Sequence, residues 1–197
     1  MTTIWAALLL AAGARAQVVR SVEAAGAGRQ YSINAVPALA LSLEGTYKSV
    51  VVHPEDPQMV VKIFDGRYGS MPAEQKRELA DVARLPPGIT PAVRQAGTAN
   101  GRPFVVVDRV DGLTLKRVTP IKLEETRKLF ARLKKAGIKL SDVESLQKLQ
   151  QNIMVGSTRG GDFRAWLVDP DLEPGTYKQA ELAAFYDGLA ARLERGR

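Results

Sequence analysis

The sequence predicts an α+β fold in two parts: a sheet-rich first part with one helix, residues 38–109, and a mainly helical second part, residues 110–197. Short apolar runs separated by Gly, Pro and Asn predict the first part, and capped amphipathic segments predict the second. The chain has 197 residues, of which 45% are hydrophobic and 25% are charged. This length and composition allow one domain, or two small lobes that share a cleft.

Five strands and one helix are predicted in the first part. The helix covers residues 72–85, with Leu79, Val82 and Leu85 on its buried face around Glu78. Asn100-Gly101 is a strong signal for a hairpin between the last two strands, and the five strands therefore form an antiparallel sheet. The predicted strands are residues 38–43, 47–52, 59–64, 93–98 and 103–107.

Residues 108–115 leave the last predicted strand, and we interpret them as a polar connector into the second part. Thr119-Pro120 then provides an N-cap and a first-turn proline for a helix that ends at Gly137. Residues 176–179 fit a capping box before a final amphipathic helix, with Leu182, Phe185, Leu189 and Leu193 directed inward.

The N-terminal residues 1–16 are a candidate signal peptide. Their apolar run is too short to span a bilayer, and Ala14-Arg15-Ala16 fits the small-x-small pattern of a cleavage site. No positive charge precedes the run, so an amphipathic helix or a misassigned start is the alternative. Residues 17–37 are rich in Ala, Gly and Ser and predict a linker or arm. A signal peptide would make the protein secreted or periplasmic; without one the protein would be cytoplasmic.

The composition excludes several kinds of site. The chain has no cysteine and one histidine, which excludes disulfides, thiolate catalysis and Cys-based zinc sites and leaves little scope for a catalytic triad. A net charge of +7 is compatible with phosphate, nucleic acid or anionic membranes. The basic residues are scattered and are not interleaved with aromatic residues, so nucleic-acid binding is not the expected main role.

Residues 137–171 contain an acid, an amide and a second acid at intervals that suit phosphoryl transfer. Asp142 follows a predicted helix, Asn152 opens a short apolar run, and Asp169 ends another apolar run. A base or orienting acid with amide and carboxylate ligands is what Mg²⁺-dependent phosphoryl transfer requires. Asp142 could instead be a turn residue that caps local backbone, with Glu144 as a substitute base. Asp171 is a second ligand or a cap.

The order of these elements resembles the protein-kinase-like fold from about residue 38 to residue 171. Val60-Val61-Lys62-Ile63 resembles the strand whose lysine holds the α- and β-phosphates, and Glu78 lies where the family's helix glutamate pairs with that lysine, with Glu74 as a competitor. Lys62 could otherwise point outward from the sheet. Gly-Ile-Lys-Leu-Ser-Asp142 resembles the segment that ends in the catalytic aspartate.

The same resemblance implies the nucleotide and metal ligands. Residues 105–112 resemble the hinge, where backbone at Asp108 and Val110 would bind adenine and Val107 would be the gatekeeper. Gly45 is the one glycine retained in the phosphate loop. Asn152 and Asp169 match the metal ligands, so the implied cofactors are ATP and Mg²⁺.

The chain also departs from the family pattern. Lys48 occupies the place of a loop glycine, Leu140-Ser141 replaces His-Arg, and ten residues separate Asp142 from Asn152 where five is normal. Only 26 residues follow Asp171, which implies a truncated C-lobe. These features resemble minimal kinases that pathogenic bacteria deliver into host cells, and the kinase-like family of the PhoP regulatory network.

Two functions follow from the resemblance. The first is a minimal protein kinase, a candidate secreted effector, that transfers the ATP γ-phosphate to a hydroxyl of a partner protein. The second is an inactive pseudokinase that senses nucleotide or docks a protein. A small-molecule phosphotransferase and a basic RNA- or membrane-binding domain are further alternatives.

Overall fold

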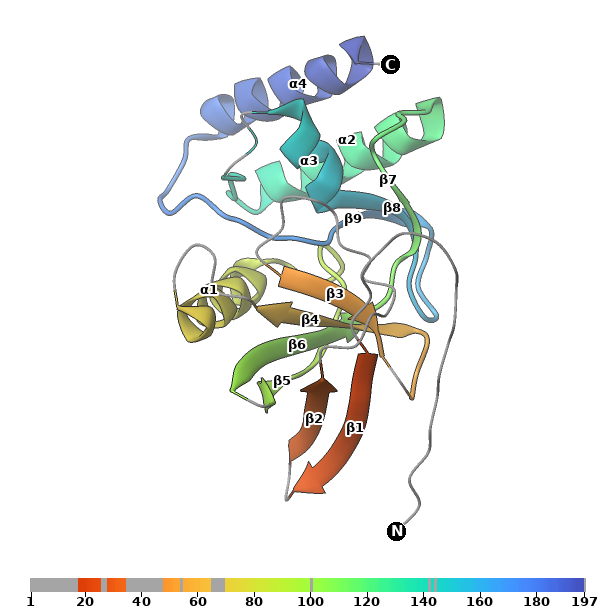
Figure 1. The fold of residues 1–197 in the computed structure, drawn as a ribbon. Coiled ribbons are helices and arrows are strands. Elements are labelled where there is room, and N and C mark those ends of the chain that lie inside the picture. Colours follow the sequence, from red (N-terminus) through yellow and green to blue (C-terminus); the bar gives the residue numbers. More distant parts are fainter. Residues whose placement is uncertain are drawn as a thin grey trace. The chain divides into compact units, whose positions relative to one another are not determined.

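The computed structural model describes residues 18–25, 28–34, 48–53, 55–64, 70–99, 101–141, 143 and 145–196 (Figure 1). The chain divides into two compact units: unit 1 comprises Met1–Lys76 and Val93–Arg109, and unit 2 comprises Arg77–Ala92 and Val110–Arg197. The described strands are β1 (Val18–Ala25), β2 (Gly28–Asn34), β3 (Lys48–Val52), β4 (Met59–Phe64), β5 (Val93–Ala99), β6 (Arg102–Asp108), β7 (Asp111–Thr114), β8 (Ile153–Ser157) and β9 (Arg164–Leu167). The described helices are α1 (Met71–Arg84), α2 (Pro120–Lys135), α3 (Leu146–Asn152) and α4 (Gln179–Arg195).

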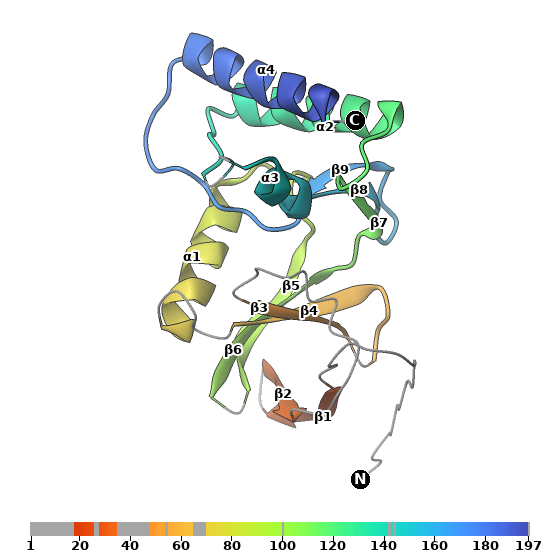
Figure 2. The same ribbon diagram turned by 45° about the horizontal axis from the view of Figure 1, so that its top comes forward.

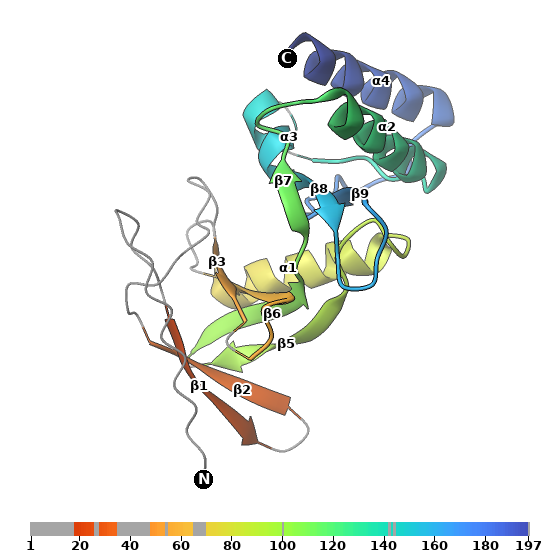
Figure 3. The ribbon, with the colours of Figure 1, turned by 90° about the vertical axis from the view of Figure 1, so that its right-hand side faces the viewer.

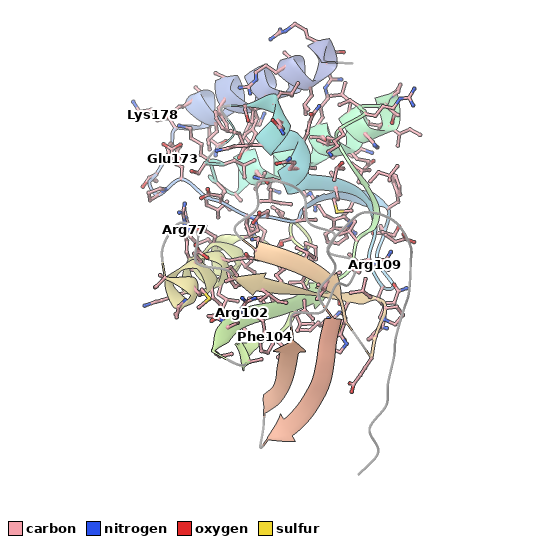
Figure 4. All side chains as sticks on the ribbon, viewed as in Figure 1. Arg77, Arg102, Phe104, Arg109, Glu173 and Lys178 are labelled. Carbon is pink, nitrogen blue, oxygen red and sulfur yellow. The ribbon has the colours of Figure 1, made fainter. Side chains whose placement is uncertain are left out.

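Unit 1 contains an antiparallel sheet of the order β3-β4-β6-β5. β4 and β6 are rich in valine and almost wholly buried, as expected for the central strands of a sheet. Phe104 on β6, labelled in Figure 4, is fully buried opposite Gly97, where an added Cβ would lie 3.1 Å from its ring. Four of the five predicted strands are therefore confirmed; the first, residues 38–43, lies outside the described residues, as does Gly45.

The segment expected to be a linker or arm, residues 17–37, contains the antiparallel hairpin β1–β2, so regular structure begins earlier than predicted. Alternating residues such as Val18, Val22 and Ile33 could have indicated this. The Gly- and Ala-rich composition outweighed that pattern in our prediction. The candidate signal peptide, residues 1–16, lies outside the described residues.

Helix α1 begins in unit 1 and ends in unit 2. In unit 1 the Gln75 side-chain amide donates hydrogen bonds to the backbone oxygens of Gly97 and Phe104, at 2.8 and 2.7 Å. The predicted buried face is wrong in part: Glu78 and Asp81 are buried, whereas Leu79 and Val82 are only half-buried. A buried acid requires polar partners, and those of Asp81 are Arg84 on the same helix and the backbone N–H of Leu172, 91 residues away.

Unit 2 contains the antiparallel sheet β7-β8-β9, which is visible beside α2 and α3 in Figure 3. β7 replaces the polar connector expected at residues 108–115. Gly112 of β7 pairs with Gly156 of β8, and a Cβ built on Gly112 would lie 2.2 Å from the Val155 carbonyl oxygen. The absence of side chains at both positions allows the two strands to pair this closely.

Helices α2 and α4 run side by side in unit 2, as Figure 2 shows. Thr119 is the N-cap of α2 and Pro120 is its first residue, as predicted. The predicted capping box is wrong, because α4 begins at Gln179 after Lys178, whose side chain makes no capping hydrogen bond. Tyr186 rather than Phe185 is the fully buried aromatic residue of α4, and its hydroxyl donates to the Ile138 carbonyl oxygen at 2.7 Å.

A large hydrophobic cluster holds unit 2 together. Its members come from the loop after α1, from α2, α3 and α4, and from the strands β8 and β9. Arg132 of α2 adds polar contacts at its edge, donating to the backbone oxygens of Gly88 at 2.7 Å and Ala165 at 3.3 Å. Burial lowers the pKa of Arg132.

In the part of the chain that the structure describes, no helix is both long and apolar enough to cross a bilayer.

Candidate functional site

The two predicted metal ligands lie at the same end of the β8–β9 ladder. Ile153 of β8 pairs with Leu167 of β9, and the next residues outward are Asn152 and Val168. The backbone N–H of Val168 donates to the Asn152 carbonyl oxygen at 2.9 Å. Asp169 follows directly, and both Asn152 and Asp169 are half-buried. The hairpin thus places Asn152 and Asp169, which are 17 positions apart in the sequence, at the same end of the ladder.

The residues after Asp169 pair with the segment that precedes Asp142. Leu172 forms an isolated antiparallel bridge with Leu140. The backbone N–H of Ser141 donates to the backbone carbonyl oxygen of Asp171 at 2.8 Å. The backbone N–H of Glu173 donates to the backbone carbonyl oxygen of Lys139 at 3.0 Å. Asp142 and Glu144 lie outside the described residues, but Ser141, next to Asp142, is fixed beside Asp171 by this pairing.

The short helix α3 occupies the long interval between Asp142 and Asn152. Ser145 is its N-cap and accepts a hydrogen bond from the Lys148 N–H at 3.2 Å. Leu149 is fully buried in the core of unit 2, and Asn152 ends the helix. The extra residues therefore fold as one helix that leads directly into β8.

Three side chains on one face of α1 contact the segment of residues 171–173, which we call the 171–173 segment. Arg77 pairs with the Asp171 carboxylate. The Asp81 carboxylate accepts a hydrogen bond from the Leu172 N–H at 3.3 Å. Arg84 donates to the backbone carbonyl oxygen of Glu173 at 3.2 Å. Figure 4 labels Arg77 on α1 and Glu173 after β9. Of the three, Asp81 alone is buried, at 6% exposure. Burial raises its pKa, with the Leu172 hydrogen bond and Arg84 opposing that rise.

Lys139 fixes the other end of this segment. Its ammonium group lies 3.0 Å from the Glu173 carboxylate, and 5.0 and 5.3 Å from the ring centroids of Tyr177 and Phe185. The hydrogen bond with Glu173 raises the pKa of Lys139. Contacts of this type with two aromatic rings favour the charged lysine.

In unit 1, Lys62 lies in the centre of β4, paired with Val50 on β3 and Val105 on β6. Its side chain does not point out into solvent, because the residue is only 6% exposed. A buried ammonium group is costly without compensating negative charge or hydrogen bonds. This burial is compatible with the predicted role of Lys62 as a fixed cation for phosphate.

Glu78 on α1 is buried, whereas Glu74, its competitor as the predicted partner of Lys62, is half-buried.

The predicted adenine-binding positions, Asp108 and Val110, are both buried, as is the predicted gatekeeper Val107. The Asp108 carboxylate accepts two hydrogen bonds from Arg94, each of 2.7 Å, and this pair raises the pKa of Arg94.

The donor chemistry at the β8–β9 end fits Mg²⁺. Asn152 and Asp169 supply hard oxygen donors, and Mg²⁺ commonly takes one or two carboxylates with phosphate and water in the rest of its shell. Over the described residues there is no group of three or more His, Cys, Asp or Glu side chains able to hold a metal. A metal bound here would therefore depend on phosphate oxygens of a nucleotide.

Sequence reasoning missed the α1 residues that reach the 171–173 segment. Arg77, Asp81 and Arg84 lie at helical spacings of four and three, which places them on one face of α1. We predicted that Leu79, Val82 and Leu85 form the buried face of this helix, and of these three only Leu85 is buried. Charged residues at helical spacing beside an apolar stripe were the available signal.

No family model matches the chain, and no curated protein matches it in sequence. Among solved structures, the chain is similar to the PknI kinase domain of Mycobacterium tuberculosis, with 17% identity and a TM-score of 0.47 over 96% of this chain and 78% of that chain. A double mutant of that domain gives 16% identity and a TM-score of 0.44 over the same shares. The chain is also similar to Rad53 residues 1–466 in complex with AMP-PNP, with 16% identity and a TM-score of 0.49 over 79% of this chain and 51% of that chain.

Proposed function

We propose that this chain is a kinase-like protein that binds ATP with Mg²⁺ and transfers the γ-phosphate to a hydroxyl of a partner protein. The observation that supports the proposal is the Asn152–Val168 backbone bond, because it holds Asn152 beside the residue that directly precedes Asp169. The buried lysine on the central strand β4 and the buried glutamate on α1 add to it.

Each residue has a defined role in this proposal. Asn152 and Asp169 would hold Mg²⁺, which neutralises charge on the transferring phosphoryl group when it is bound. Lys62 would hold the α- and β-phosphates, with Glu78 orienting it. Asp142 would orient the acceptor hydroxyl and accept its proton. Asp171 is paired with Arg77, which favours a positioning role for it over that of a second ligand.

Backbone groups would bind the rest of the nucleotide. Asp108 and Val110 are proposed to bind adenine through the main chain, since the Asp108 carboxylate is already paired with Arg94. Gly45 is proposed to let the backbone approach the phosphates, because glycine has no Cβ to obstruct that approach.

A pseudokinase is the second candidate, and two observations favour it. Lys48, at the position of a phosphate-loop glycine, is buried and its ammonium group lies 5.6 Å from the Phe64 ring centroid. Helix α3 also separates the candidate base from the candidate metal ligand more widely than a kinase catalytic loop does. Nucleotide binding without transfer would fit such an arrangement.

A thermal-shift titration with ATP, with and without Mg²⁺, tests nucleotide binding. We expect Mg²⁺-ATP at about 100 times its Kd to stabilise the wild-type protein by about 2.7 kcal/mol. The variants D169A and K62A should lose this stabilisation, whereas the matched control D187A, which removes an exposed acid of α4, should retain it. An unchanged response in both site variants would overturn the proposal.

Transfer of radiolabelled phosphate to protein then separates the two candidates. A kinase would label a protein acceptor and lose labelling in D142N, whereas a pseudokinase would bind Mg²⁺-ATP without labelling anything. The role of a secreted effector depends on residues 1–16, and N-terminal sequencing of the mature protein tests whether Gln17 is its first residue.

A further inference from the structure

We propose that Asp81 is a positioning residue for the metal site: through the Leu172 N–H it fixes the 171–173 segment, and the Mg²⁺ affinity of Asn152 and Asp169 depends on it. This inference rests on the function proposed above. Asp81 is not among the residues assigned to metal or nucleotide, and its hydrogen bond with Leu172 would act through the backbone that carries Asp169.

The direction of the Leu172 N–H makes Asp81 necessary. In the antiparallel bridge, Asp171 and Glu173 use their backbone groups toward residues 139–141. Successive residues of an extended segment direct their N–H groups to opposite edges, so the Leu172 N–H points away from that partner. Leu172 is 3% exposed, and its N–H donates to the Asp81 carboxylate at 3.3 Å. Asp81 therefore takes the place that a neighbouring strand would occupy.

The same part of the chain also holds the other side of Asp169. Four residues after Arg84, Gly88 adopts a left-handed conformation, with φ of 76°, in the turn that follows α1. The next residue, Ile89, is fully buried, and its carbonyl oxygen accepts a hydrogen bond from the Leu167 N–H at 2.9 Å. Asp169 thus lies between Leu167 and Leu172, and both are bonded to α1 or to the turn that ends it. Loss of the Asp81 carboxylate would remove the hydrogen bond to Leu172 and leave the bond between Leu167 and Ile89 in place.

A carboxylate at position 81 is not the choice that packing alone would make. The residue is 6% exposed, it pairs with Arg84 at 3.4 Å, and burial opposes its charged form. An apolar side chain would fill this place without that desolvation cost. Acceptance of the Leu172 N–H is what an apolar residue could not supply, because the buried N–H would then have no acceptor.

Three variants of the full chain test the inference. D81A removes the acceptor, D81N removes the charge but keeps an oxygen acceptor, and V118A shortens another buried side chain of the same hydrophobic core. The measurement is the Mg²⁺ concentration that gives half of the metal-dependent thermal shift at fixed ATP. Removing a group that holds a metal ligand in place without touching the metal changes the metal affinity by about 10- to 100-fold.

We call the Mg²⁺ concentration that gives half of the metal-dependent thermal shift the Mg²⁺ midpoint. We expect D81A to raise this midpoint by about 10-fold or more and D81N to leave it near the wild-type value. V118A should lower the melting temperature without changing the midpoint. The shift with ATP in the absence of Mg²⁺ should be the same in all four proteins. An unchanged midpoint in D81A, or equal changes in D81A and V118A, would overturn the positioning role. A wild-type protein with no Mg²⁺-dependent shift would overturn the proposed function, and this inference with it.

Discussion

The Val168 N–H lies 2.9 Å from the Asn152 carbonyl oxygen, and this one backbone bond closes the β8–β9 ladder where the two candidate ligands are. Asn152 ends α3 and Val168 follows β9, so the bond joins two elements of unit 2. The side chain of Asn152 is not needed for this bond, because only its main chain takes part. The backbone and the side chain of Asn152 can therefore be tested separately.

Replacing Asn152 by leucine should abolish the Mg²⁺-dependent part of ATP binding, because leucine has no oxygen to offer the metal. N152D should retain it, since a carboxylate is also a hard oxygen donor. Thermal shift with ATP, with and without Mg²⁺, measures the difference. Similar Mg²⁺ midpoints in N152L and the wild type would exclude Asn152 as a ligand.

The pH dependence of stability should report on Asp81. Its pKa is raised in the folded state by burial, so the folded protein holds this proton more tightly than the unfolded chain does. The stability contributed by this group is fully present below its unfolded pKa of about 3.9, and it is lost as the pH rises through the folded value. Urea unfolding from about pH 4 to 7 should therefore show the wild type losing stability relative to D81N. A constant difference between the two would contradict the pKa shift.

G112A should destabilise unit 2 by about 1–3 kcal/mol or more, since its methyl group would lie 2.2 Å from the Val155 carbonyl oxygen and the β7–β8 pairing would have to open. The matched control is G188A in helix α4, where an added Cβ meets nothing within 4 Å. Alanine favours a helix over glycine by roughly 0.5–1 kcal/mol, so G188A should be stabilising. Urea denaturation measures both, and equal effects would argue against the close strand approach.

Y186F should cost about 1–3 kcal/mol, because it leaves the Ile138 carbonyl oxygen without the buried hydroxyl that donates to it at 2.7 Å. The ring stays in place against Phe130, 5.1 Å between centroids, so little packing is lost. Denaturant unfolding gives the change in free energy. F185L, at the half-buried neighbouring position, is the control and should cost less.

Local patterns in the sequence were sufficient for most elements. The valine-rich strands β4 and β6 and the Thr119-Pro120 start of α2 were all predicted, because each depends on residues close together in the chain. The apolar runs after Asn152 and before Asp169 pair as β8 and β9, which places these two residues at the same end of the ladder.

Features that depend on distant partners were not predictable. β7 contains Gly112 and polar residues, and it is a strand only because Gly156 lets β8 approach it. Asp81 is buried because the Leu172 N–H, 91 residues away, needs an acceptor. The α4 capping box failed since Thr176 and Gln179 match a motif that the chain does not use. In each case tertiary contacts overrode the local preference.

Helix α3 has a consequence for how the length of this loop can vary. The helix has its own N-cap at Ser145 and one buried side chain at Leu149, and its last residue leads into β8. Adding or removing a whole helical turn, about four residues, would leave the direction of entry into β8 nearly the same. A search pattern with a fixed gap between the acid and the amide would therefore overlook chains of this kind, whereas a pattern with a gap adjustable by whole helical turns would find them.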